Sequence, residues 1–75
     1  SHYTVNPYSI NIDLNVGFNI TTPSSHQKID ISKISASHYS ISLAKDTMPS
    51  TRDFILEFEP VAGVRYSTYE VVISP

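Results

Sequence analysis

Apolar and polar side chains alternate along the first part of the chain. The apolar side chains are Tyr8, Ile10, Ile12, Leu14 and Val16, and the polar residues between them are Ser9, Asn11, Asp13 and Asn15. A period of two residues places all apolar side chains on one face, which predicts a half-buried β-strand. Gly17 ends this run, and we expect a bulge or bend there, because glycine adopts backbone conformations that other residues avoid.

Four further segments show a similar pattern. We predict strands at residues 28–33, 38–43, 54–58 and 64–73. The link at residues 34–37 is short enough for a hairpin. Pro60 ends the fourth strand because proline cannot donate a ladder hydrogen bond. The segment TTPSSHQ at residues 21–27 is rich in hydroxyl groups and is broken by Pro23, so it is expected to form a loop.

Five short strands without an amphipathic helical stripe predict an all-β fold, a small antiparallel β-sandwich of about five or more short strands. The side chains expected to point inward are Ile10, Ile12, Leu14, Ile29, Ile31, Tyr39, Ile41, Leu43, Phe54, Leu56, Phe58, Val71 and Ile73. Residues 1–75 are interpreted as one sandwich module, because a chain this short removes only about 60% of its unfolded surface from water. The chain begins Ser-His and ends just after an apolar run, so we expect a module excised from a larger multidomain protein.

Composition excludes several classes of function. The chain has 5 Lys and Arg against 7 Asp and Glu, a net charge of −2, and these few cations form no basic stripe for phosphate groups. We therefore expect no nucleic acid partner. Membrane insertion is not expected either, because no continuous run of about 18 apolar residues is present. The absence of cysteine excludes disulfides, thiolate zinc sites and a cysteine nucleophile.

Side chains that could bind a metal do not show the spacing of a metal site. The histidines and nearby acids are His2, His26, His38, Asp13, Asp30 and Asp46. They form no His-x-His pair, no His-x-x-x-His pair and no calcium loop, so we expect neither metal nor cofactor.

Candidate catalytic groups are equally weak. Ser24 and Ser25 directly precede His26, but neighbours in sequence rarely point toward one another, and a nucleophile needs a base held by a third group. Glu57 and Glu59 alternate with apolar residues, so we expect them on the solvent face rather than in an apolar catalytic pocket. No catalytic residue is predicted.

Several runs together resemble a known family. INIDLNVGFNI, SSHQKIDIS, MPSTRDFILEFEP and the closing VVISP are similar to the segment that joins the VIT domain to the von Willebrand A domain in inter-alpha-trypsin inhibitor heavy chain-like proteins, including bacterial surface and sortase-target members. The matching positions are Leu14, Gly17, Phe18, Ser25, His26, Arg52, Asp53, Phe54 and Leu56. One departure is the missing proline between Ser24 and Ser25, since Pro23 lies just upstream instead.

The resemblance implies a hybrid-domain-like β-sandwich spacer beside an A domain, with Arg52 and Asp53 at a strand entry and Phe54 turning into the core. It implies a non-enzymatic structural module of a surface or secreted protein, one that orients an adjacent adhesion domain. The partners would be the neighbouring domains, and the location would be extracytoplasmic. Cation-dependent adhesion in the family belongs to domains that this sequence does not include.

Two other functions stay open at this point. A stand-alone carbohydrate- or protein-binding module would use exposed tyrosines, which are abundant for a chain of this length, and a hydrolytic enzyme is the more distant alternative. The tyrosines are Tyr3, Tyr8, Tyr39, Tyr66 and Tyr69, and alternation places at least Tyr39 and Tyr69 toward the core. We also expect a homodimer formed through the free edges of the terminal strands at residues 3–16 and 64–73, because unpaired backbone groups favour pairing with another chain.

Overall fold

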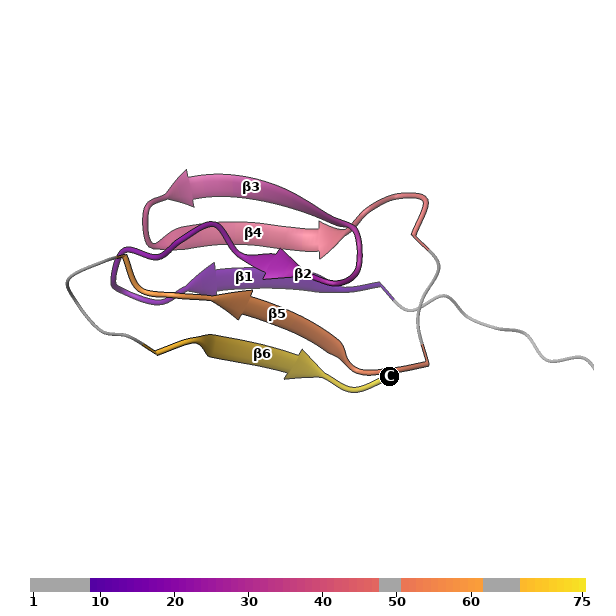
Figure 1. Cartoon of the computed structure of the whole chain (residues 1–75). Helices are drawn as coiled ribbons and strands as arrows, with labels where there is room; N and C mark the ends of the chain where they lie inside the picture. Colours follow the sequence, from indigo (N-terminus) through magenta and orange to yellow (C-terminus); the bar gives the residue numbers. More distant parts are fainter. Residues whose placement is uncertain (1–8, 48–50, 62–66) are drawn as a thin grey trace, which may run out of the picture.

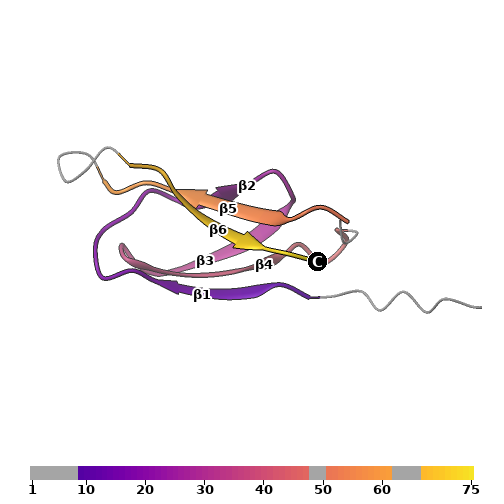
Figure 2. The same ribbon diagram turned by 90° about the horizontal axis from the view of Figure 1, so that it is seen from below.

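Strands are the regular elements throughout the described residues, which are 9–47, 51–61 and 67–75 of a computed structural model. The strands are β1 (Asn11–Asn15), β2 (Ser24–Ser25), β3 (Ile29–Ser35), β4 (His38–Leu43), β5 (Phe54–Phe58) and β6 (Tyr69–Ile73). They form two three-stranded antiparallel sheets, in the orders β1-β4-β3 and β2-β5-β6 (Figure 1). Seen after a 90° turn, the sheets lie as two layers (Figure 2). The predicted all-β antiparallel sandwich is confirmed.

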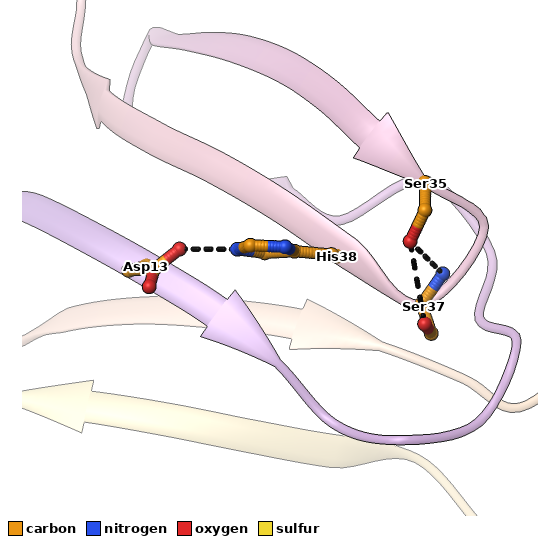
Figure 3. Close-up of polar contacts among 4 residues, drawn as sticks. All are labelled: Asp13, Ser35, Ser37 and His38. Atoms are coloured by element: carbon orange, nitrogen blue, oxygen red, sulfur yellow. Dashed lines mark hydrogen bonds and ion pairs between the residues drawn. The ribbon is translucent and has the colours of Figure 1, made fainter.

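The two central strands, β4 and β5, have the predicted bounds. Strand β3 is longer than predicted and includes Ile34 and Ser35, so the hairpin to β4 turns on Ala36 and Ser37 alone. A shift of register between Lys33 and Ser35 accommodates this tight turn, as β-bulges do. The Ser37 N–H donates a hydrogen bond to Ser35 Oγ at 3.3 Å (Figure 3).

The last strand is shorter than predicted. Ser67 and Thr68 are outside it, and residues 64–66 lie outside the described residues.

Strand β2 corrects the expectation that residues 21–27 form only a loop. Ser24 lies opposite Glu57 and Ser25 lies opposite Leu56, so this short segment adds a third strand to the second sheet. The side chain of Pro23, just before it, is fully buried. Two polar residues carry no apolar alternation, which is why the sequence pattern did not reveal this strand.

The segment after β1 carries the chain from one sheet to the other. Gly17 has a φ of 77°, in the left-handed region that favours glycine, so the expected bend is confirmed. Val16 and Ile20 donate their N–H groups to the carbonyls of Ser37 and Ala36 at 3.1 and 2.9 Å, and the Thr21 N–H then donates to the Glu59 carbonyl at 2.8 Å. The crossing therefore stays hydrogen-bonded to both sheets.

One core lies between the sheets. Apart from the prolines, the buried apolar side chains of the described residues are Ile10, Leu14, Ile20, Tyr39, Ile41, Phe54, Leu56 and Phe58. Partly buried residues packed against them are Ile12, Val16, Phe18, Ile29, Leu43, Tyr69, Val71 and Ile73. The ring of Tyr69 contacts both Phe18 and Phe58, with centroids 6.0 and 5.6 Å apart. The predicted core is therefore confirmed except at one position, and Ile20 joins it.

The exception is Ile31, which was predicted to be inward and is 37% exposed. It lies directly opposite the core residue Ile41 on β4, so its side chain is on the inner face of the sheet, as the alternation predicted. Strand β3 is an edge strand, however. Figure 1 shows it at the top of the view, above β2, which is the shortest strand of the other sheet. The second sheet therefore leaves Ile31 partly uncovered.

Both terminal strands lie at sheet edges. Strand β1 is an edge of the first sheet, with β3 at the opposite edge, and β6 is an edge of the second sheet, with β2 opposite. The position of β1 and β6 is compatible with the expected edge pairing, which remains a prediction.

Truncating Phe54 or Leu56 to alanine should strongly destabilise the fold. Both side chains are 0% exposed, so either change leaves a cavity between the sheets. We expect the free energy of unfolding to fall by about 2–5 kcal/mol, measured by chemical denaturation. Val72→Ala is the matched control, because Val72 is 52% exposed on the same sheet and its truncation should cost far less. Unchanged stability in both core variants would contradict the proposed core.

Candidate functional site

A depression at one end of the sandwich brings together two segments that are far apart in the sequence. Its volume is about 390 Å³, and it is lined by His26, Gln27, Arg52, Asp53 and Ile55. Three of these residues, His26, Arg52 and Asp53, belong to the motifs on which the family resemblance rests. We take this end depression as the candidate site.

The pairing of β2 with β5 creates the end depression. The two strands are antiparallel, with Ser25 opposite Leu56, so the residues after β2 and those before β5 emerge at the same end. The Gln27 N–H donates a hydrogen bond to Ser25 Oγ at 3.2 Å. Such serine turns redirect the chain locally, and this one fixes the path through His26 and Gln27.

The end depression has mixed chemistry. His26, Arg52 and Asp53 are exposed, and Ile55 adds a half-buried apolar surface beside them. The Oε1 atom of Gln27 is buried and accepts no hydrogen bond from any of the described residues. A buried acceptor without a donor costs free energy.

Two smaller hollows continue from the end depression along the outer side of β5. The first has a volume of about 100 Å³ and is lined by Ser24, Ser25, His26, Ile55 and Glu57. The second has a volume of about 170 Å³ and is lined by Thr21, Thr22, Ser24, Glu57, Phe58, Glu59 and Thr68. Because adjacent hollows share lining residues, together they form one shallow band of hydroxyl and carboxylate groups beside β2.

The carboxylates of this band lie where the alternation placed them. Glu59 is exposed and Glu57 is half-buried, while Leu56 and Phe58 point into the core. Thr68 Oγ1 donates a hydrogen bond to Glu59 Oε1 at 3.2 Å, and this contact ties the segment before β6 to the end of β5.

The end depression lies at the end of the sandwich where β1 begins and β6 ends. Ile73, at the end of β6, pairs with Phe54, which directly follows Asp53. Strand β1 begins at Asn11, which pairs with Ser42 near the end of β4. Figure 1 shows the beginning of β1 and the end of β6 at the same end of the sandwich.

The other polar candidates lie apart from the end depression. His38 Nε2 and Asp13 Oδ1 are 2.5 Å apart across β4 and β1, on the outer face of the first sheet (Figure 3). The side chain of His38 is 25% exposed and that of Asp13 is 76% exposed. This cross-strand pair joins two of the residues that were considered as metal ligands from the sequence, where no metal site was expected. In residues 9–47, 51–61 and 67–75, no three His, Cys, Asp or Glu side chains are grouped to hold a metal ion.

The described tyrosines take part in packing. Tyr39 is 3% exposed, and Tyr69 is half-buried between two phenylalanine rings, as the alternation predicted. Tyr3, Tyr8 and Tyr66 lie outside the described residues, as does His2.

Comparisons with protein-family models, curated proteins and solved structures gave no match. Within the part of the chain that the structure describes, no helix is long and apolar enough to span a membrane.

Adding calcium, magnesium or zinc should not change the melting temperature of the chain. A metal that binds the native state raises the melting temperature by mass action, and we expect no such site. The measurement is a thermal melt at metal concentrations from micromolar to millimolar, with a chelator as the reference. A saturable rise at micromolar metal would contradict this prediction.

Proposed function

We propose that this chain is a non-enzymatic structural module of a surface or secreted protein, and that it holds a neighbouring domain in a fixed orientation through the end depression. One observation carries the proposal. The end depression, formed by His26, Gln27, Arg52, Asp53 and Ile55, lies at the end of the sandwich where β1 begins and β6 ends. A domain attached by a short connection at either point would lie against it.

The chemistry of the end depression suits a contact between domains. Interfaces between domains of one chain are more polar than obligate interfaces, and this surface combines charged groups with one apolar side chain, Ile55. The guanidinium of Arg52 and the carboxylate of Asp53 suit charge-assisted hydrogen bonds.

The family resemblance supports the same proposal. Ser25-His26 and Arg52-Asp53 resemble motif segments of the region between the VIT and von Willebrand A domains, and the pairing of β2 with β5 brings these two segments of the chain side by side. On this proposal the module is hybrid-domain-like and extracytoplasmic, and the domain that it orients is an adhesion domain of the A type.

The positions of the hydroxyl and imidazole groups favour a structural role over hydrolysis. Ser25 Oγ accepts the hydrogen bond that shapes its own turn, and the imidazole of His38 pairs with Asp13 on the outer face of the first sheet. The packing of Tyr39 and Tyr69 in the core similarly favours a structural role over a tyrosine-lined binding surface.

The test compares the isolated chain with the longer protein that carries its flanking domains. Ile55→Lys and Arg52→Glu should lower the melting temperature of the longer protein by several degrees more than that of the isolated chain. The reason is that an interface loses its fit when a charge is buried or reversed. Differential scanning calorimetry gives both temperatures.

Ile34→Lys is the matched control, because it places a charge on an exposed position of the first sheet, outside the residues that line the end depression. Its effect should be equal in the two proteins. The proposal fails if the variants of the end depression shift both proteins equally, or if the sandwich and its neighbours unfold independently of one another.

A further inference from the structure

The free edge of β3 carries backbone groups that its own sheet does not use. The Ala44 N–H donates a hydrogen bond to the Lys28 carbonyl at 2.9 Å, so residue 28 directs its backbone groups toward β4. Alternate residues of an antiparallel strand direct these groups to the same side. The residues of β3 whose N–H and C=O groups point to the free edge are therefore Ile29, Ile31 and Lys33.

The side chains of β3 leave this edge uncovered. Every residue of β3 after Ile29 is exposed, whereas the strand beside it, β4, includes side chains as buried as Ile41 at 1%. Ile31 lies directly opposite Ile41 on the core side of the sheet and is 37% exposed. The apolar side chain of Ile31 thus lies next to a strand edge whose N–H and C=O groups have no partner strand among the described residues. This combination favours the addition of another strand.

We propose that a second copy of this chain adds its β3 to the β3 edge, antiparallel and about a two-fold axis at Ile31. The inference does not depend on the proposed function. In this register Ile31 contacts Ile31 of the second copy, and the N–H and C=O groups of the two residues bond to each other, as in a hydrogen-bonded antiparallel pair. The β1-β4-β3 sheet of one copy then joins the same sheet of the second copy, and the two form one continuous sheet of about six strands.

The edge of β3 is self-complementary in this register. Asp30 lies opposite Ser32 of the second copy, and Lys33 lies opposite Ile29, so no two like charges oppose each other directly. The aliphatic stem of a lysine packs on apolar surface while its ammonium group reaches water. A net charge of −2 adds only weak repulsion between copies.

Strand β1 is a poorer edge for the same partner. The Val16 N–H donates to the Ser37 carbonyl, so alternation directs the backbone groups of Asn11, Asp13 and Asn15 to the free edge of β1. If β1 paired with β1 of a second copy about a two-fold axis at Asp13, the Asp13 carboxylates of the two copies would lie directly opposite each other. Like charges in this position are destabilising. Strand β1 also has 5 residues against the 7 of β3, and therefore fewer ladder bonds. These differences favour β3 over β1 as the interface.

Cross-linking tests the register directly, because the chain contains no cysteine of its own. In the proposed dimer the two copies of residue 31 have Cα atoms about 5.5 Å apart, within the range of a disulfide. Ile31→Cys should therefore form a covalent dimer under mild oxidation at least about tenfold faster than Ser32→Cys, whose side chain lies opposite Asp30 on the other face. Equal rates for the two variants would overturn the proposal.

Proline substitution tests which edge is used. Lys33→Pro removes an N–H that points to the free edge of β3, and Asn15→Pro removes the equivalent group of β1, in each case without removing a ladder hydrogen bond within the monomer. Light scattering over a concentration series should show that Lys33→Pro weakens dimerisation by at least about tenfold and that Asn15→Pro leaves it unchanged.

Circular dichroism checks that both proline variants keep the β fold. If either variant unfolds, the cross-linking rates of Ile31→Cys and Ser32→Cys decide whether β3 forms the interface. A dimer weakened by Asn15→Pro and unaffected by Lys33→Pro would assign the interface to β1 and overturn the proposal. The same holds if the unmodified chain is a strict monomer at millimolar concentration.

Discussion

Packing of β5 against β4 is the interaction on which the rest of the structure depends. Each sheet has only three strands, and small isolated sheets are marginal in water unless one face is buried. Phe54 and Leu56 are 0% exposed and Ile41 is 1% exposed, so the two central strands bury most of their inner faces. The outer strands add partial cover, and the crossing at Gly17 lets the chain reach the second sheet while it remains hydrogen-bonded to the first.

The same packing positions the candidate site. The end depression lies on residues that directly follow β2 and directly precede β5, so the core fixes its walls through the pairing of these strands. Polar groups on short segments held by a rigid scaffold are a common arrangement for recognition. The free edge of β3 has a different origin, because β3 is the outermost strand of the first sheet and its apolar residue Ile31 is 37% exposed. One end of the sandwich is therefore suited to a neighbouring domain and one edge to a second strand.

Alternation in the sequence predicted those features that depend on a single strand. It placed β4 and β5 correctly, gave most of the core, and identified Gly17 as a bend. Features that depend on pairing between distant segments were not predictable in this way. Strand β2 has 2 residues and forms because β5 lies beside it. Ile31 is partly exposed because the opposite sheet does not cover it fully. The meeting of His26 with Arg52 and Asp53 likewise follows from that pairing, and neither spacing nor composition indicates it.

Both sheets share one core, and they should therefore unfold together. Native-state amide hydrogen exchange measures this directly, because it gives an opening free energy for each protected amide. The ladder amides of β4 and those of β5 should exchange with the same free energy, equal to that of global unfolding. If the amides of β5 and β6 exchange at a clearly lower free energy than those of β4, the second sheet opens independently and the claim of a single shared core is wrong.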